Sequence, residues 1–230
     1  MQSLIACVIG GFVGCAIVHS IDPFFKFANI PELGISPPPE LVKQYNAAKL
    51  AFWCNNLALN FGLLGFCLGS GVGFISTQVR RIQSAIVGSV GGMLAGATAG
   101  YLSGMVVTRT LIASEDQSLI QSTVLHFALW ASVFATILLL VGFVQSGPIR
   151  ALNCALVGIV VGLVVAVFYN ILSSLIFPQT NLLTLIPESR FERFIWILSC
   201  SIVFGMGMHH GLNRMRPSSP AKMENSIAIS

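Results

Sequence analysis

The stretch IQSAIVGSVGGMLAGATAGYLSGMVV, residues 82–107, decides the fold because it carries a glycine at every fourth position and no charged side chain. These glycines are Gly88, Gly92, Gly96, Gly100 and Gly104. A spacing of four places them along one face of a helix. In water such a bare face is unfavourable, since glycine loses more backbone entropy on folding than any other residue. In lipid it lets a second backbone approach closely, and packing then drives the association of helices. We therefore predict a membrane-spanning helix over about 83–107, at the centre of a bundle.

The composition of the whole chain also indicates a membrane protein. The chain has 230 residues, of which 55% are hydrophobic and 9% charged, and its mean hydropathy is +0.84. Soluble domains carry about 25% charged residues, so this chain has too few charges to cover a soluble surface. The net charge of +4 is small. Because no basic stripe is interleaved with aromatic residues, nucleic acid is not an expected partner.

We expect an all-α integral membrane bundle of six transmembrane helices that forms one domain over residues 1–212. The expected spans are about 3–19, 48–76, 83–107, 121–144, 151–177 and 193–212. In the second span, Gly65, Gly69 and Gly73 repeat the spacing of four, which predicts glycine-zipper packing there too. Residues 20–47 are expected to form a loop, because the proline run at 37–39 breaks a helix. The proline-containing polar segment 213–230 is predicted to be a disordered cytoplasmic tail.

The basic residues favour an orientation with both termini in the cytoplasm, in a cell (inner) membrane crossed several times. With this topology the inner segments contain Arg80, Arg81, Arg150, Arg214, Arg216 and Lys222. The outer loops contain six basic residues as well, but they are longer and carry most of the acidic residues. Basic residues concentrate in short cytoplasmic loops. The higher density of basic residues in the short inner segments therefore favours this orientation.

The chain contains weak internal repeats. A shift of 70 residues aligns Gly88 and Gly92 with Gly158 and Gly162. A looser pattern gives three repeated hairpins, in which each returning helix carries a tryptophan: Trp53, Trp130 and Trp196. We interpret these tryptophans as anchors at the outer membrane interface. The alternative, that any six-helix membrane protein follows such a pattern, stays open.

No set of residues in the spans indicates catalysis or metal binding. The expected spans lack charged residues beyond their first few positions, which argues against a proton-coupled pump or a voltage sensor. The six cysteines include no Cys-x-x-Cys pair. We therefore expect no enzyme, no metal and no cofactor. The remaining polar candidates are Asn56, Asn60, His126 and Asn170, which either line a path for a solute or hydrogen-bond across helices.

Residues 121–180 resemble a group of known sequences. The features are His126-x3-Trp130, a Gly/Ala-rich helix and then Leu175-Ile176-Phe177-Pro178. They resemble uncharacterised polytopic bacterial membrane proteins, for which no activity is assigned, so the resemblance implies no catalytic residue. The helices with regularly spaced glycines are also similar to those of mitochondrial inner-membrane translocase channel subunits, which have four spans.

The expected function follows from these features. We predict a non-enzymatic multi-pass membrane protein that acts through helix packing, as a homo-oligomer or as a subunit of a larger membrane assembly, with the lipid bilayer as its surroundings. The alternative is a passive channel or facilitator for a small neutral solute, because buried charge is absent from the spans.

Overall fold

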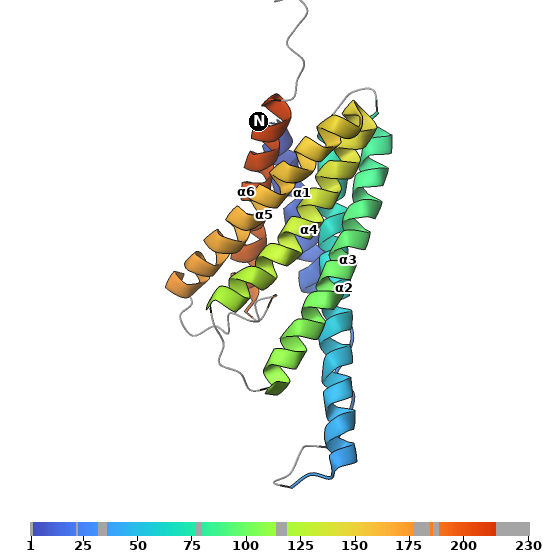
Figure 1. Cartoon of the computed structure of the whole chain (residues 1–230), viewed down its shortest axis with the longest axis vertical. Coiled ribbons are helices and arrows are strands. Elements are labelled where there is room, and N and C mark those ends of the chain that lie inside the picture. The colour runs from blue at the N-terminus through green and yellow to red at the C-terminus, as the bar shows by residue number, and fades with distance from the viewer. Residues whose placement is uncertain are drawn as a thin grey trace, which may run out of the picture.

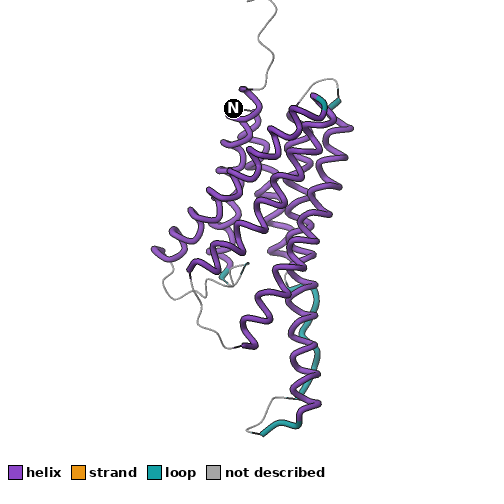
Figure 2. The backbone as a smooth tube through the Cα atoms, viewed as in Figure 1, coloured by secondary structure: helices purple, strands orange, loops and turns teal. Residues whose placement is uncertain are grey.

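The computed structural model describes residues 2–21, 23–31, 36–76, 80–113, 119–176, 185 and 189–214, and these residues form an all-helical bundle without strands (Figures 1 and 2). The helices in this described part are α1 (Gln2–Ile21), α2 (Pro39–Ser76), α3 (Arg81–Ala113), α4 (Leu119–Ser146), α5 (Pro148–Ile176) and α6 (Arg190–Arg214). The predicted disordered tail lies outside the described residues from 215 onward. Its first two residues belong to α6.

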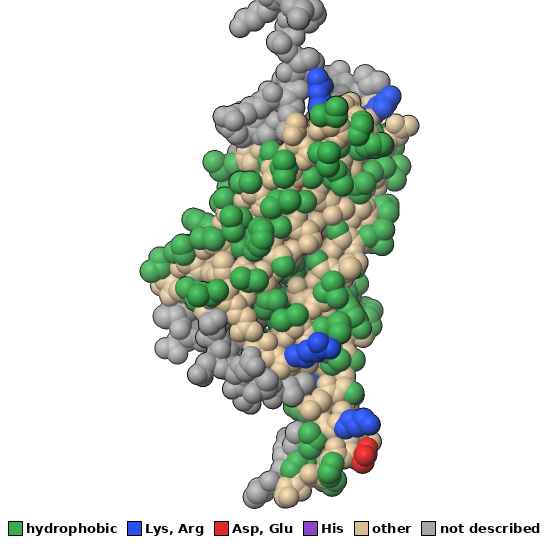
Figure 3. Space-filling view, in the orientation of Figure 1, with side chains coloured by type: hydrophobic (Ala, Val, Ile, Leu, Met, Phe, Trp, Pro, Cys, Tyr) green, Lys and Arg blue, Asp and Glu red, His purple; other side chains and the backbone are tan. Residues whose placement is uncertain are grey.

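Among the described residues, four helices are long and apolar enough to cross a membrane. They cover Pro39–Ile75, Arg81–Thr110, Leu119–Ser146 and Pro148–Ile176. The apolar part of α1, Ile5–Ile21, is shorter. The chain is therefore a multi-pass membrane protein by the length and composition of these four helices. Apolar side chains are spread over the face of the bundle shown in Figure 3, and many large ones are exposed, as expected for a surface in contact with lipid.

The start of α2 differs from the sequence prediction. The helix begins at Pro39 and not near residue 48, so the expected loop over 20–47 is shorter. Proline is tolerated in the first helical turn because its missing N–H would have no helical partner there. The carbonyl of Pro38 accepts hydrogen bonds from the N–H groups of Leu41 and Val42, at 3.0 and 3.2 Å. At 1.5 Å per residue the 38 residues of α2 extend about 57 Å, so the helix projects beyond the bundle (Figure 1).

The helices form a closed ring. Each helix packs against the next one along the chain, and α1 packs against α6 to complete the ring. The centre is filled by large side chains of the even-numbered helices. Phe61 of α2, Trp130 of α4 and Trp196 of α6 are fully buried. Their ring centroids form a triangle with sides of 5.5 to 5.7 Å.

This position corrects the prediction for two of the tryptophans. Trp130 and Trp196 are each only 1% exposed, so they are core residues and not anchors in the headgroup region. Their indoles bury a large apolar area among other aromatic rings, and this burial favours the interior. Trp53 is half-buried and lies against Phe52, with ring centroids 5.7 Å apart.

The two ends of the bundle carry different connections. The start of α1, the end of α6, the end of α2, the start of α3 and the α4–α5 turn lie at one end (Figure 1). In the α4–α5 turn Gly147 adopts a φ of 84°, a left-handed conformation that other residues rarely adopt. At the same end, Arg80 Nη1 donates a hydrogen bond of 2.9 Å to the carbonyl of Val144. The start of α2 and the end of α3 lie at the opposite end.

Candidate functional site

The glycines of α2 and α3 face each other across one seam. A Cβ atom built on Gly65 would overlap the carbonyl oxygen of Gly92, and one built on Gly69 would overlap that of Gly88. A Cβ on Gly73 would overlap Ser84 and Ala85. The backbones of the two helices therefore touch directly at this half of the seam, where only glycine fits.

The rest of the α3 stripe packs against residues of α2 that are not glycine. A Cβ on Gly96 would overlap the carbonyl oxygen of Phe61, and one on Gly100 would lie 2.5 Å from that of Leu57. A Cβ on Gly104 would lie 2.8 Å from the Cα of Cys54. Two residues that face each other across the seam have residue numbers with a sum of about 157, as for Gly65 and Gly92. This constant sum shows that α2 and α3 run antiparallel. All five glycines of the stripe therefore pack against α2.

The α4–α5 pair packs in a similar way. A Cβ on Gly158 would lie 2.7 Å from the Cα of Ala135, and one on Gly162 would lie 2.6 Å from the Cα of Ala131. Helix α1 also approaches α2 closely, since a Cβ on Gly10 would lie 2.9 Å from the carbonyl oxygen of Cys67. Small residues therefore bring several pairs of backbones together, which increases the dispersion contacts that hold helices in lipid.

Asn56 holds the segment before α2. Its Nδ2 donates hydrogen bonds to the carbonyls of Phe25, at 2.9 Å, and Phe52, at 3.0 Å, and its Oδ1 accepts the N–H of Phe25 at 3.0 Å. The amide thus pairs with both backbone groups of Phe25. The ring of Phe27 adds contacts to Tyr45 and Phe52, with centroids 5.4 and 5.8 Å apart. As Figure 2 shows, the extended segment runs beside the first half of α2.

His126 and Asn170 belong to a second buried cluster, which joins α4 to α5. The hydroxyl of Ser122 donates to Oδ1 of Asn170 at 2.8 Å, and Asn170 Nδ2 donates to the carbonyl of Ala166 at 2.9 Å. Nδ1 of His126 lies 2.9 Å from the carbonyl of Ser122. The imidazole also packs on Tyr169, with ring centroids 4.9 Å apart and an interplanar angle of 36°. The cluster therefore links the two helices through the hydrogen bond from Ser122 to the side-chain amide of Asn170.

Three ring nitrogens near the bundle centre have no hydrogen-bond partner among the described residues. They are Nε2 of His126 and the Nε1 atoms of Trp130 and Trp196. All three side chains are 1% exposed. An unpaired buried donor or acceptor is costly, so such groups are rare in folded proteins. The ring of Phe61 lies edge-to-face with both indoles, with centroids 5.7 Å apart.

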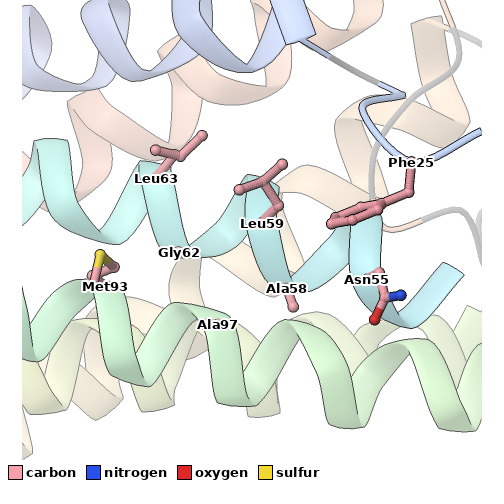
Figure 4. A pocket seen from close by; sticks show the side chains of 8 residues that line it. All are labelled: Phe25, Asn55, Ala58, Leu59, Gly62, Leu63, Met93 and Ala97. Atoms are coloured by element: carbon pink, nitrogen blue, oxygen red, sulfur yellow. The ribbon is translucent and has the colours of Figure 1, made fainter. Parts of the chain in front are cut away.

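A pocket of about 360 Å³ lies away from this cluster, on the outer side of the α2–α3 seam (Figure 4). It is lined by Phe25, Asn55, Ala58, Leu59, Gly62, Leu63, Met93 and Ala97. In Figure 4 Leu59 and Leu63 stand on one side of Gly62, and Met93 stands on the other. Asn55 supplies the one polar side chain of this lining. The pocket reaches the lower end of the volume range of small-ligand sites.

Comparison with other proteins identifies no relative. No family model matches the chain, and no curated protein or solved structure is similar to it. Within the described residues, no three His, Cys, Asp or Glu side chains are grouped so that they can hold a metal ion.

The four polar residues proposed from the sequence do not meet in one place. His126 and Asn170 share the α4–α5 cluster, Asn56 binds Phe25, and Asn60 is buried in α2 with an interaction of its own. None of the four lines the pocket described above. Ser122, which connects the cluster, is not among the residues predicted from the sequence. Its spacing of four before His126 on one apolar helix was the available signal.

Proposed function

We propose that the chain is a non-enzymatic, multi-pass membrane protein that works as a structural subunit of a membrane assembly. The supporting observation is that its buried amide side chains connect elements of the bundle. Asn56 fixes the segment at Phe25, and Asn170 joins α5 to Ser122 of α4. Such hydrogen bonds and close backbone contacts are the usual means of holding helices together in lipid.

The proposal includes glycine-zipper packing and six spans in a bacterial cell (inner) membrane. The glycine contacts of α2 with α3 support the zipper, and the closed ring supports α1 and α6 as spans beside the other four helices. Because the α3 glycines pack within the chain, the surface left for a partner or a second copy is apolar and lies on the outer faces. On α5 this surface contains Leu152, Leu156, Val160, Leu163, Val167, Phe168 and Ile171.

The size of the native particle tests this proposal. Membranes that contain the chain at its natural level are to be solubilised in mild detergents and the particle mass measured. We expect a discrete particle larger than one 24.6 kDa chain with its detergent and lipid. A particle of one chain in each mild detergent, together with an absence of protein cross-links in intact membranes, would contradict the proposal.

The proposed orientation places the end with Arg80 and Arg150 in the cytoplasm, since basic residues accumulate on that side. A cysteine in place of Arg150 should then be protected from a membrane-impermeant maleimide in intact cells. A cysteine in place of Lys43, near the start of α2, should be labelled. The reverse labelling pattern would invert the topology.

A passive facilitator for a small neutral solute is the second candidate. The unpaired ring nitrogens of His126, Trp130 and Trp196 favour it, because they are polar groups in the interior of the bundle. A liposome flux assay separates the two candidates. Flux that disappears in Asn60→Leu, with the melting temperature unchanged, would support the facilitator, and an absence of flux for neutral solutes would support the structural subunit.

A further inference from the structure

The outer pocket on the α2–α3 seam has the position of a site for a membrane lipid. Its floor consists of small residues, because Gly62 and Ala97 face each other there: a Cβ on Gly62 would lie 3.4 Å from the Cβ of Ala97. Its walls are apolar, with Leu59, Leu63 and Met93 around the floor (Figure 4). Since α2 and α3 are both long and apolar enough to span a membrane, the chemistry of this hollow matches an acyl chain.

One end of the pocket differs from the rest. Phe25 and Asn55 lie there, and the Asn56 amide holds the backbone of Phe25 at this place through two hydrogen bonds, of 2.9 and 3.0 Å. The amide of Asn55 is exposed. Its N–H groups can therefore donate a hydrogen bond to an ester oxygen of a lipid without breaking a hydrogen bond inside the bundle.

Basic residues lie beyond this end of the pocket along the chain and along the helices. Lys26 follows Phe25 directly, and Lys49 precedes Asn55 by six residues, or about 9 Å along the helix. The α2–α3 register, in which facing numbers add up to about 157, places Arg109 at the height of Lys49. Figure 3 shows Lys and Arg side chains toward the end from which α2 projects, one of them beside an acidic side chain.

The length of α2 between Lys49 and Leu63 agrees with the thickness of one membrane leaflet. From Leu63 to Lys49 the helix rises about 21 Å over fourteen residues. Half of a bilayer, including its headgroup region, is about 20–22 Å thick. A lipid with its phosphate beside Lys49 and Arg109 therefore has an acyl chain long enough to reach Leu63.

We infer that the α2–α3 pocket binds one anionic phospholipid of the surrounding bilayer, with an acyl chain over Gly62 and Ala97 and the phosphate near Lys26, Lys49 and Arg109. This inference rests on α2 and α3 as membrane spans and not on the proposed role as an assembly subunit. The apolar lining selects an acyl chain, and the basic residues select the negative headgroup, since each one near the membrane surface adds about fivefold to the binding of acidic lipid.

Native mass spectrometry of the purified chain tests the inference with two defined lipids, palmitoyl-oleoyl phosphatidylglycerol and the corresponding phosphatidylcholine. The wild-type chain should retain one phosphatidylglycerol in preference to phosphatidylcholine. Ala97→Leu fills the floor and should remove this retained lipid. The matched control Ala128→Leu, at an exposed position of α4 outside the pocket, should retain it. Lys49→Gln should lower the preference for phosphatidylglycerol by about fivefold.

A second measurement covers the case in which Ala97→Leu does not fold. Benzoylphenylalanine in place of Leu59 should form a photo-adduct with the mass of one phosphatidylglycerol in nanodiscs. An adduct with a second copy of the chain, or no adduct, would show that the pocket does not hold a lipid. Equal retention of the two lipids, or unchanged retention in a folded Ala97→Leu variant, would also overturn the inference.

Discussion

Replacing Gly96 with leucine perturbs the α2–α3 seam at its middle. A Cβ atom there would lie 2.7 Å from the carbonyl carbon of Phe61 and 3.2 Å from the backbone nitrogen of Gly62. Carbon atoms pack at about 3.5 Å, so the two helices must separate by at least about 0.8 Å at this point (3.5 minus 2.7), and by more where the Cβ would overlap the carbonyl oxygen of Phe61. The atoms in the way belong to a helical backbone, which cannot rotate aside as a side chain can.

The energetic cost follows from this separation. A gap of 0.5–1 Å removes about a quarter to a half of the dispersion energy of each affected contact. Insertion of one extra group into a packed core costs about 1–3 kcal/mol, and leucine adds an isobutyl group. We therefore expect Gly96→Leu to lower the free energy of unfolding by about 3 kcal/mol. For a chain of this length that corresponds to a fall in Tm of about 6–12 °C.

Thermal unfolding in a mild detergent, followed by tryptophan fluorescence, measures this effect. The matched control is Thr98→Leu, which adds a leucine at an exposed position of the same helix. It should change stability by no more than about 0.5 kcal/mol. If both variants melted at the same temperature as the wild-type chain, the close approach of α2 and α3 at Gly96 would be refuted.

Further substitutions test other parts of the fold. Gly147→Ala should cost about 1–2 kcal/mol because of the positive φ, whereas Gly147→Asn should cost less; equal melting temperatures would contradict this. Trp130→Ala should lower stability by about 3–5 kcal/mol, as measured by denaturant unfolding, since the indole fills the centre. Asn170→Leu should cost about 1 kcal/mol in the same assay, as the Ser122 hydrogen bond is lost. Asn56→Leu should release the segment at Phe25, so that trypsin cleaves after Lys26 faster than in the wild-type chain, and an unchanged cleavage rate would count against the clamp.

Much of the helical architecture follows from local sequence features. Long apolar runs separated by glycine, proline and charged residues predict helices, and the structure has a helix in each predicted place. The start of α2 was missed because a proline run can either end a helix or begin one. The sequence alone does not show which of the two applies at Pro39.

Long-range contacts were not predictable from these patterns. Asn56 binds the backbone of a residue 31 positions earlier, and a hydrogen bond to a main-chain group leaves no signature in the partner's residue type. The burial of Trp130 and Trp196 depends on how the even-numbered helices meet, and the tryptophan spacing alone is equally compatible with an interfacial belt. The spacing of the α3 glycines indicated a close packing face without identifying the helix against it.

Disulfide formation between α2 and α3 tests the central claim most directly. The hydroxyl oxygens of Ser70 and Ser89 lie 2.6 Å apart across the seam, so cysteines at these positions, in a chain without its native cysteines, are close enough for an S–S bond of about 2.05 Å. The account predicts rapid oxidation to a disulfide within one chain. The control pair replaces Ser70 and Thr98, and Thr98 lies about 13 Å along α3 from Ser89, so this pair should stay reduced. Failure of the Ser70 and Ser89 pair to cross-link, or a disulfide only between two chains, would contradict the packing of α2 on α3 within the bundle.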